Sequence, residues 1–464
     1  MFNRIDILLK SILKLKLNYQ KMSTKIVRIG VCQLNSRGDK QENFQIGEQL
    51  INQAKKEQAK IVFFPEAFDY ISESISETLE KAEPIDGPII NGYRQLAKQH
   101  QLWISLGGFH QRSGDGTRVL NSHLIINDQG DIVGRYSKIH LFDVQAGSQV
   151  IRESDFTQPG SSITNPIETP AGRIALGICY DLRFVEFARL LTASHENGAQ
   201  ILTYPSAFTK HTGEAHWEIL VRARAIENQC FVVAAAQVGS HNRKRQSYGH
   251  SLVVDPWGKV LLDMNLDSPL VRTIDIDLGY IEQVREKMPI IQHRRRDLYT
   301  LMSPTTIIVP IDDKNEEKIC WGQLEIKRNQ IFFRSTLTLA FVNKKPVVPG
   351  HVLVSPFRCV ERFSQLNPEE INDLFQSTQL IGRKIEEYYQ AKSLSIAIQD
   401  GEYAGQTVKH VHVHILPRRA GDFEENDTIY YELAHHDKRD KGWREEQDMA
   451  DEAINLRKLF YQDT

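Results

Sequence analysis

Cysteine is scarce in this 464-residue chain, and no two cysteines form a C-x-x-C pair. The five stand far apart, at Cys32, Cys179, Cys230, Cys320 and Cys359. An odd, dispersed set argues against a disulfide framework and against a zinc site built from paired cysteines. The chain also lacks any apolar run of about 18 residues, the length that a membrane-spanning helix needs. We therefore expect a protein without membrane contact in a reducing compartment, most simply the cytoplasm.

An excess of either charge is missing as well. Lysine and arginine total 57 against 59 aspartates and glutamates, so the formal charge is −2 and the pI is near 6.8. Without surplus positive charge to attract a phosphate backbone, we expect small-molecule partners and no nucleic acid. The sequence contains no P-loop, G-x-S-x-G elbow, H-E-x-x-H helix or G-x-G-x-x-G turn. The enzyme classes that depend on those motifs therefore have no support.

The chain begins with a basic, leucine-rich stretch over residues 1–22, in which Asp6 is the one acidic residue. This composition suits a mitochondrial transit peptide. The alternative is a frayed extension ahead of a start at Met22. The sequence leaves both interpretations open.

The length of the chain exceeds one ordinary hydrophobic core, so a domain boundary is expected. From residue 25 to 309, short β-branched runs alternate with longer amphipathic segments, which is typical of an α/β domain. Residues 310–318, "PIDDKNEEK", are charged and begin with proline, which predicts a surface linker. Residues 319–464 then predict strands and turns around one long helix, an α+β domain. Residues 1–24 form an extension ahead of both.

Helices are predicted where apolar positions recur at helical spacing. In the first domain the two examples are residues 43–59 and 185–199, the second ending with Gly198. In the second domain Asn367 can cap a helix, and Glu370 completes a capping box. The apolar stripe of that helix is formed by Ile371, Leu374, Phe375, Ile381 and Ile385.

Three histidines alternate with apolar residues in "KHVHVHILPR", residues 409–418. In a strand, His410, His412 and His414 would line one surface while the valines face the core. Three imidazoles on one surface indicate a metal site or chemistry on a phosphate; the bland alternative is a polar solvent face. His351 and the "PRR" run add basic groups where carboxylates are sparse. This donor set suits an anionic phosphate better than a divalent cation.

This stretch, with "QDGEYAGQTV" before it and "FVNKKPVVPGHVLVSP" further upstream, resembles the histidine-triad family, and closely its fragile-histidine-triad branch of dinucleoside polyphosphate hydrolases. The resemblance covers residues 319–464. It implies that His412 attacks the α-phosphorus of diadenosine triphosphate and cleaves it to AMP and ADP through a nucleotidyl-histidine that water hydrolyses. Transferase relatives carry glutamine at the position of His414, so hydrolysis is favoured.

The same resemblance implies roles for further residues. His410, His414 and His351 would hold the phosphates and support the leaving group. Gln399 would lie near the scissile phosphates and Asn343 would contact the ribose. Tyr430 would belong to a mobile loop, "NDTIYYEL". A divalent cation, Mg²⁺ or Mn²⁺, is the cofactor left open for this domain.

A second stretch, "RIALGICYDLRF", predicts a buried strand over Ile174–Ile178 that ends at Cys179 and turns into a helix near Phe184. A cysteine at such a corner lies beside the positive end of the helix dipole, which can stabilise its thiolate. Cys179 is therefore a candidate nucleophile. The alternative is an inert, buried cysteine.

Two charged residues also follow strands, Glu66 after "IVFFP" and Lys138 after "DIVGRYS". With Cys179 they supply a base, a cation and a nucleophile, the set that acyl transfer needs. This constellation resembles the nitrilase, or carbon-nitrogen hydrolase, superfamily over residues 25–305. The resemblance implies a four-layer αββα sandwich in which Glu66 is the general base, Lys138 stabilises the oxyanion and Cys179 forms a thioester. Glu153 would be the supporting second glutamate, and no cofactor is required.

The local sequences are most similar to the Nit branch, whose members act on deaminated glutathione or as omega-amidases. Together the two resemblances match the family of nitrilase and fragile-histidine-triad fusion proteins. They imply a bifunctional hydrolase whose ligands are a small amide and a dinucleoside polyphosphate. Relatives of both kinds form dimers, so a homotetramer is the implied assembly.

Two rival interpretations stay open. In one, the second domain is a signalling module that binds dinucleoside polyphosphates, and the occupied complex is the output. In the other, the first domain is a catalytically silent scaffold for oligomerisation.

Overall fold

The computed structural model describes residues 25–146, 149–193, 198–295, 298–299, 301, 308–309, 311, 318–435 and 443–461. The expected extension of residues 1–24 lies outside the described residues, and so does most of the expected linker, at 310 and 312–317. None of the described helices is long and apolar enough to cross a membrane. The chain divides into two compact units, Met1–Arg295 and Arg296–Thr464.

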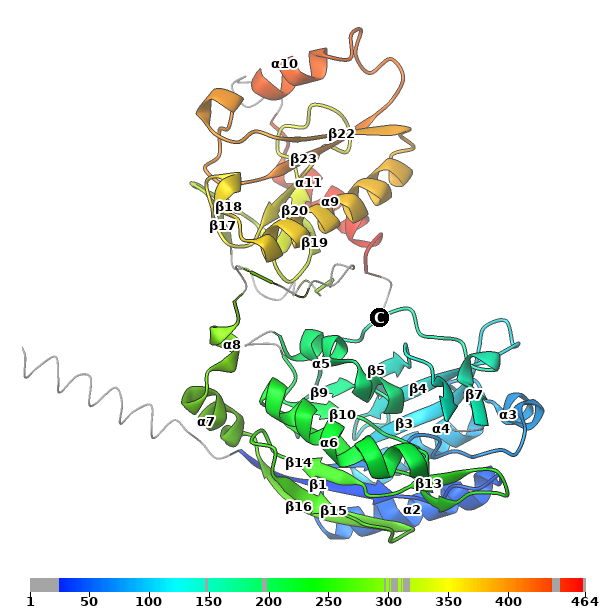
Figure 1. The fold of residues 1–464 in the computed structure, drawn as a ribbon. Coiled ribbons are helices and arrows are strands. Elements are labelled where there is room, and N and C mark those ends of the chain that lie inside the picture. Colours follow the sequence, from blue (N-terminus) through cyan, green and yellow to red (C-terminus); the bar gives the residue numbers. More distant parts are fainter. Residues whose placement is uncertain are drawn as a thin grey trace, which may run out of the picture. The chain divides into compact units, whose positions relative to one another are not determined.

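Two six-stranded sheets form the centre of the first unit (Figure 1). Their strand orders are β16-β1-β2-β3-β4-β5 and β15-β14-β11-β10-β9-β8. Each sheet has three parallel strands in its middle and antiparallel strands on both sides. The strands of the first sheet are β1 (Ile26–Gln33), β2 (Ile61–Phe64), β3 (Trp103–Arg112), β4 (Val119–Ile126), β5 (Ile132–Ser137) and β16 (Leu270–Asp277). Those of the second are β8 (Ile167–Thr169), β9 (Gly172–Leu176), β10 (Ile201–Thr203), β11 (Phe231–Ala234), β14 (Leu252–Val254) and β15 (Val260–Asp263).

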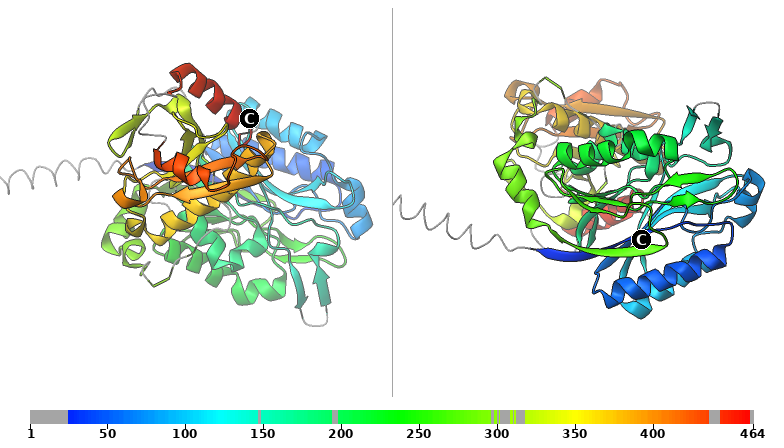
Figure 2. Two further views of the ribbon diagram at one scale, coloured as in Figure 1. Left: turned by 90° about the horizontal axis from the view of Figure 1, so that it is seen from above. Right: turned by 60° about the horizontal axis from the view of Figure 1, so that its bottom comes forward.

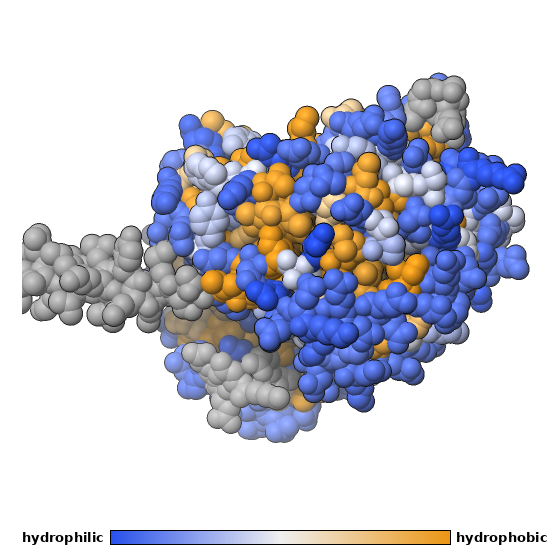
Figure 3. Space-filling view, turned by 90° about the horizontal axis from the view of Figure 1, so that it is seen from below, coloured by the Kyte–Doolittle hydropathy of each residue, from blue (hydrophilic) through white to orange (hydrophobic). Residues whose placement is uncertain are grey.

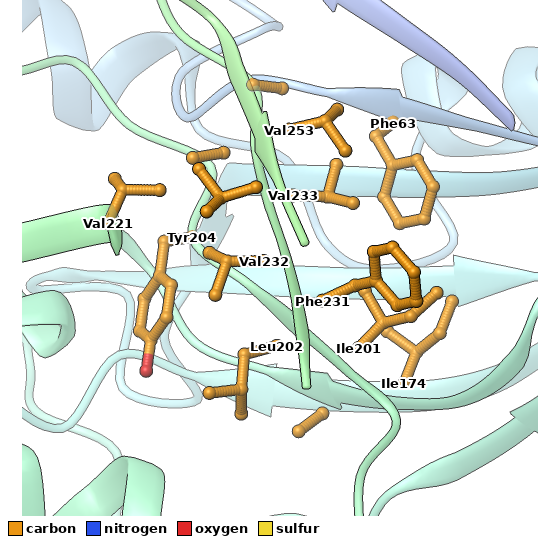
Figure 4. Packing of buried hydrophobic residues seen from close by; sticks show 14 of the residues in the cluster. Phe63, Ile174, Ile201, Leu202, Tyr204, Val221, Phe231, Val232, Val233 and Val253 are labelled. Carbon is orange, nitrogen blue, oxygen red and sulfur yellow. The ribbon is translucent and has the colours of Figure 1, made fainter. Parts of the chain in front are cut away.

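The inner faces of the two sheets meet in one apolar core. β-branched and aromatic side chains dominate it, because such side chains pack well on a pleated surface. Phe63 of the first sheet lies close to Ile174, Ile201, Phe231 and Val233 of the second (Figure 4). All five are at most 2% exposed.

Helices cover the outer faces. α2 (Lys40–Lys56) and α4 (Pro88–His100) share a core with strands of the first sheet. α5 (Val185–Thr192) and α6 (Lys210–Asn228) pack on the second. The order is therefore helix, sheet, sheet, helix (Figure 2), and the expected four-layer αββα sandwich is confirmed. Smaller elements complete the unit: α3 (Ile75–Lys81), β6 (Asp143–Ala146), β7 (Gln149–Arg152), β12 (Val238–Ser240), β13 (Gln246–Tyr248), α7 (Gly279–Lys287) and α8 (Ile290–His293).

Both helices predicted for this unit are present, but their first and last residues differ from the prediction. α2 begins earlier than expected because Asp39 caps it, accepting hydrogen bonds from the amides of Gln41 and Glu42. α5 ends at Thr192, well before Gly198, so the predicted end was wrong. Residues 194–197, which separate the two positions, lie outside the described residues.

The second unit is a five-stranded antiparallel sheet in the order β19-β20-β21-β23-β22. The expected α+β histidine-triad fold is confirmed. Its strands are β19 (Ile331–Arg334), β20 (Thr338–Val342), β21 (Val352–Pro356), β22 (Ser393–Ile398) and β23 (Val413–Arg418). Two helices, α9 (Pro368–Tyr388) and α11 (Glu446–Arg457), share an apolar core with the sheet. A hairpin of β17 (Ile319–Trp321) and β18 (Leu324–Ile326) and the short helix α10 (Thr428–His435) complete it.

The cap of α9 is as predicted: the Asn367 side chain accepts from the amide of Glu370, and the reciprocal bond is present. The predicted apolar stripe was wrong at Phe375, which is 42% exposed, whereas Leu374 is fully buried. Two further elements differ from the sequence analysis. The segment expected to be a mobile loop forms α10, and the sequence analysis did not predict α11.

Residues just ahead of the expected linker pair with the second unit. Ile308 forms a β-bridge to Ser335, and the amide of Val309 donates to the carbonyl of Arg334 at 2.9 Å. Tyr461 also donates its hydroxyl to the Val309 carbonyl at 3.0 Å. The backbone hydrogen bonds of this short segment are therefore satisfied within the second unit.

Candidate active sites

Cys179 follows the end of β9 in the first unit. Its amide donates to the carbonyl of Pro205 at 2.9 Å, and its backbone has φ +45°, in the left-handed region that non-glycine residues rarely adopt. A five-residue 3-10 turn (Cys179–Arg183) separates the cysteine from α5, whose N-cap is Phe184. The strand-to-helix corner was predicted correctly. The sharp turn aims the sulfur away from the strand and into a cavity.

The structure brings the other predicted residues to the same cavity. Glu66, Lys138, Glu153 and Cys179 all line it, although the four come from distant parts of the chain. The ammonium of Lys138 lies 3.0 Å from Glu66 Oε1 and 2.8 Å from Glu153 Oε2. Cys179 lines the cavity close enough to Glu66 for the carboxylate charge to raise the pKa of the thiol. A nucleophile, a carboxylate and a cation thus line one cavity, with none more than 9% exposed.

Asn121, in β4, is a member of this cluster that the sequence analysis missed. Its side-chain amide donates to Glu66 Oε1 at 2.9 Å and to Glu153 Oε1 at 3.3 Å. Its main-chain carbonyl accepts from the amide of Lys138 at 2.9 Å. One residue therefore contacts both glutamates and the lysine. The signal that could have revealed it is the polar run Asn121–His123 between the apolar ends of the stretch "VLNSHLII".

Burial and charge set the protonation states. Burial alone would raise the pKa of Glu66, but the Lys138 ammonium and the neighbouring Cys179 outweigh it, so the pKa lies below its ordinary value. For Lys138 the two carboxylates likewise outweigh burial and hold the pKa well above the usual range. Burial, with the nearby Glu66 charge, raises the pKa of Cys179 strongly. The sequence indicated that the helix dipole can stabilise the thiolate; burial and the Glu66 charge shift the pKa of the Cys179 thiol in the opposite direction.

A bulge in β3 makes room for Glu66. The pairing of β3 with β4 shifts between Leu106 and Phe109, and Gly108 there has φ +70°. A Cβ at Gly108 would lie 2.6 Å from Glu66 Cγ, a distance at which the carboxylate would have to move. The amide of Ala67 donates to the Gly108 carbonyl at 2.8 Å. Glycine is therefore required for this close approach.

The histidines of the second unit are less exposed than predicted. β23 begins at Val413, so His410 and His412 precede the strand, and only His414 lies within it. Their exposures are 1% for His410, 4% for His412 and 2% for His414. The hairpin carrying Trp321 contacts them, with ring centroids 5.1 Å apart for Trp321 and His412. The three imidazoles, expected along one surface, are therefore buried, while the valines do face the core as predicted.

Backbone carbonyls orient the imidazoles. His412 Nδ1 lies 2.7 Å from the carbonyl oxygen of His410. Because a carbonyl only accepts, Nδ1 carries the proton and Nε2 of the neutral ring carries the lone pair. The same argument protonates Nε2 of His410, which lies 3.0 Å from the Pro356 carbonyl. Burial lowers the pKa of His410 to about 4, so this ring is neutral at pH 7.

His351 and His414 form a pair with defined proton positions. The amide of Val347 donates to His351 Nδ1 at 3.1 Å, so His351 carries its proton on Nε2. That nitrogen lies 2.9 Å from His414 Nδ1, which must then accept. His414 consequently carries its proton on Nε2 and is a hydrogen-bond donor there. His412 and His414, with ring centroids 4.9 Å apart, present a lone pair and an N–H donor side by side.

The remaining predicted residues lie at different distances from this cluster. Asn343 is buried, and its amide lies 3.3 Å from His351 Nε2. Gln399 follows β22 and donates to the carbonyl of Leu433 at 3.4 Å. Tyr430 lies on α10 and is 61% exposed, so the structure does not bury it with the imidazoles. Within the described ranges, no group of three or more His, Cys, Asp or Glu side chains is arranged to hold a metal ion.

Comparison with known proteins matches each of the two units to a family. Residues 28–286 match the carbon-nitrogen hydrolase family, and residues 324–421 match the HIT domain. The nitrilase and fragile histidine triad fusion protein NitFhit of Caenorhabditis elegans is 44% identical over 437 residues, which cover 93% of this chain and 96% of that protein. The human deaminated glutathione amidase is 48% identical over 281 residues, 60% of this chain and 85% of that protein.

Solved structures agree with these matches. The crystal structure of the C. elegans NitFhit protein superposes with a TM-score of 0.79 at 41% identity, covering 94% of this chain and all of that one. The structure of Saccharomyces cerevisiae Nit3, a member of branch 10 of the nitrilase superfamily, superposes with a TM-score of 0.53 at 29% identity. It covers 59% of this chain and 98% of that one. NitFhit of C. elegans therefore shares the order of the two folds with this chain, whereas Nit3 shares the fold of the first unit.

Proposed function

Because the chain belongs to the carbon-nitrogen hydrolase family, in the group that carries a HIT domain behind the nitrilase domain, we propose that it is a bifunctional hydrolase with two separate sites. The first site hydrolyses a small amide. The second cleaves diadenosine triphosphate to AMP and ADP. The observation that carries the first half is that Cys179, Glu66 and Lys138 line one cavity, with the Lys138 ammonium 3.0 Å from Glu66.

The amidase reaction follows from these contacts. Glu66 takes the thiol proton as Cys179 attacks the amide carbon, and Lys138 stabilises the negative charge that develops on the carbonyl oxygen. Collapse of the tetrahedral intermediate expels the amine of the scissile amide, which receives the proton from Glu66, and leaves a thioester. That amine is ammonia for an omega-amide and a larger amino compound for deaminated glutathione, whose amides are peptide bonds. Glu66 then deprotonates a water that attacks the thioester. The products are the carboxylic acid and the free thiol.

The amide is proposed to be deaminated glutathione or an omega-amide. Supporting this choice are the deaminated glutathione amidases of human and cattle, which are 48% and 50% identical to the first unit of this chain. Glu153 and Asn121 hold the Lys138 ammonium and the Glu66 carboxylate in place. No cofactor takes part in this half of the proposal.

The proposed phosphohydrolase uses His412. Its Nε2 lone pair attacks the α-phosphorus, the P–O bond to the leaving ADP breaks, and a nucleotidyl-histidine forms; water then releases AMP. Nε2–H of His414 donates toward the oxygens on which charge develops. His410, His351, Gln399, Asn343 and Tyr430 are proposed to contact the nucleotide. The proposal for this site includes a divalent cation, Mg²⁺ or Mn²⁺, that accompanies the substrate.

Assembly and location complete the proposal. We propose a cytoplasmic homotetramer, with mitochondria as the alternative compartment. Large apolar side chains are exposed on the first unit, among them Ile219 at 70% and Leu266 at 66%. Figure 3 shows apolar patches on one face of the protein. Exposed apolar patches of this kind are typical of association surfaces.

A two-variant experiment tests the two-site proposal. Ammonia from an amide and AMP from diadenosine triphosphate are measured for Cys179→Ala and His412→Asn. Loss of a covalent nucleophile costs roughly a million-fold in turnover. We expect Cys179→Ala to abolish ammonia release and leave AMP release intact, and His412→Asn to do the reverse. If either folded variant lost both activities, the two-site proposal would be wrong.

The main rival is a signalling module that binds dinucleoside polyphosphates without needing turnover. His412→Asn also addresses this rival, because it removes the nucleophile while leaving the other three histidines. A downstream effect that survives in this variant, with nucleotide binding intact, would favour signalling over hydrolysis as the biological output.

A further inference from the structure

Asp181 is a carboxylate close to the first site that the proposed reaction does not use. It stands two residues beyond Cys179 and is 0% exposed, and it is absent from the described lining of the cavity. A carboxylate buried in this way is costly unless hydrogen bonds compensate for the lost water. The donors that surround Asp181 therefore show what the carboxylate holds together.

One donor belongs to the turn that carries the nucleophile. The amide of Ile178 donates to Asp181 Oδ2 at 2.8 Å, and the amide of Asp181 donates to the Ile178 carbonyl at 3.0 Å. These two hydrogen bonds connect the residues before and after Cys179, whose backbone has φ +45°. A non-glycine residue keeps such a strained conformation only where its surroundings hold it. The Asp181 carboxylate is thus one of the groups that hold Cys179 in place.

The other donors belong to the segment that carries Lys138. The Tyr136 hydroxyl donates to Asp181 Oδ2 at 2.8 Å. The backbone amide of His140 and its ring Nδ1 lie 3.4 Å and 2.7 Å from Asp181 Oδ1. Because an ionised carboxylate only accepts, Nδ1 of His140 carries a proton. Tyr136 and His140 stand two residues before and two residues after Lys138, so the carboxylate contacts the chain on both sides of the lysine.

These two donors are themselves fixed. Tyr136 is 1% exposed, and burial, with the nearby Asp181 charge, raises its pKa, so the hydroxyl stays protonated. The same hydroxyl accepts from the amide of Ile139 at 3.2 Å. The His140 ring stacks on Phe184, the N-cap of α5, with centroids 3.6 Å apart and planes 9° apart. Neither donor can leave the carboxylate without disturbing a second contact.

We propose that Asp181 is a positioning residue of the amidase, in which one buried carboxylate fixes the turn of Cys179 against the segment of Lys138. It thereby sets where the attacking sulfur lies relative to the ammonium that stabilises the oxyanion. This inference rests on the amidase proposed for the same site. Asp181 acts through these two residues and does not touch the substrate.

Asp181→Asn tests the proposal through the split between kcat and KM. Asparagine keeps the shape, but its amide nitrogen cannot accept, so the hydrogen bonds at one of the two oxygens are lost. Lys138 meets the negative charge only after the sulfur has attacked, so its position affects the transition state and not substrate binding. A displacement of about 1 Å can cost about 100-fold in rate. We expect a loss of that order in kcat for the amide, with KM unchanged.

Tyr136→Phe removes one link to the Lys138 segment and keeps the bond from Ile178. A hydrogen bond to a charged group is worth about 1.5–3 kcal/mol, or about 10- to 100-fold. We expect kcat to fall about 10-fold, the lower end of that range, again with KM unchanged. If Asp181→Asn fails to fold, this variant carries the same test.

The double variant of Tyr136→Phe and Asp181→Asn reports whether the two residues act together. Changes that break the same link are not additive, whereas changes at independent positions are. We therefore expect the double variant to lose little more kcat than Asp181→Asn alone. Fully additive losses would overturn the proposal.

Asp255→Asn is the matched control. Asp255 is 5% exposed, and its carboxylate also closes a turn, accepting from the amides of Trp257 and Lys259, both at 2.9 Å. The control should lower the Tm of the first unit and leave kcat within about twofold, because it contacts neither catalytic segment. Equal losses of kcat in Asp255→Asn and Asp181→Asn would mean general destabilisation and overturn the proposal. So would a full kcat in Asp181→Asn.

Hydrogen exchange followed by mass spectrometry separates this inference from the amidase proposal, because it requires no turnover. We expect Asp181→Asn to speed exchange about 10- to 100-fold in residues 178–183 and in residues 138–142, and Asp255→Asn to do so in neither segment. That result would support the link between the two segments even if the wild type hydrolysed no amide, which would count against the amidase alone. Unchanged exchange in residues 138–142 of Asp181→Asn would overturn the inference alone.

Discussion

At the scale of single residues, the first site depends on one cation shared by two buried carboxylates. Lys138 is 2% exposed and contacts both Glu66 and Glu153. Removing one partner of a buried ion pair costs more than the pair contributes, because the remaining charge is left without compensation. The lysine therefore contributes to the stability of the first unit as well as to the proposed chemistry.

We therefore expect Lys138→Met to destabilise the first unit by about 3–5 kcal/mol. Differential scanning calorimetry would show this as a lower Tm for the transition of that unit. The variant loses the ammonium that holds the pKa of Glu66 low. Its stability should therefore fall less than that of the wild type when the pH is lowered. A Tm within about 1 °C of the wild type would contradict the contacts described for Lys138.

Asn121 gives a second prediction at this scale. Its amide donates to both glutamates, so Asn121→Ala removes two hydrogen bonds to ionised acceptors and lets the Glu66 carboxylate rotate. Supporting contacts of this kind are worth about 10- to 100-fold in activity, and we expect that loss in kcat/KM for the amide. The acid limb of the pH profile should move to higher pH, because Glu66 loses a donor that favours its ionised form. If the acid limb of the pH profile stayed at the wild-type pH, Asn121 would have a purely structural role.

At the scale of elements, the turns that follow three strands position the catalytic residues of the first site. β2, β5 and β9 end just before Glu66, Lys138 and Cys179 respectively. The bulge of β3 at Gly108 completes the arrangement by letting that strand pass close to Glu66. A change confined to this bulge should therefore alter catalysis without touching any catalytic side chain.

Gly108→Ala tests this point. The new Cβ would meet Glu66 Cγ at 2.6 Å at a position with φ +70°, so Glu66 must shift and the backbone is strained. A displacement of about 1 Å can cost 100-fold in rate, and we expect a loss of that order in kcat together with a lower Tm. Gly114→Ala is the control, since nothing lies within 4 Å of its Cβ position. Equal activity in the two variants would contradict the account of the bulge.

At the scale of the whole molecule, three buried histidines link stability to pH. Burial lowers the pKa to about 4 for His123 and His241 in the first unit and for His410 in the second. The ordinary value is 6.5. Between these values the unfolded chain binds more protons than the folded one, so the stability present at neutral pH is lost as the pH falls from about 6.5 toward 4.

Thermal unfolding at pH 7.5, 5.5 and 4.5 measures this dependence. We expect Tm to fall across the series for both units, and His123→Gln to reduce the fall in the first unit. His216→Gln, at an exposed position, is the control and should leave the slope unchanged. A Tm that stays constant, or rises, on acidification would contradict the burial of these imidazoles.

The sequence by itself determined the two fold classes, the order of the domains and the identity of the chemical groups. This was possible because nucleophile, base and cation each follow a β-branched strand, and because "HVHVH" alternates with the period of a strand. Local patterns of this kind indicate on which face of a strand, or at which end of it, a residue lies. They also predicted the cap of α9 correctly, since capping depends on neighbouring residues alone.

Only the tertiary structure decided what depends on residues far apart in the chain. The role of Asn121, the raised pKa of the Cys179 thiol and the burial of the histidines under Trp321 all depend on such neighbours. A pKa, a proton position or an exposure is set by the atoms that surround a group. Those atoms are brought together by the packing of sheets and helices, and no local pattern contains that information.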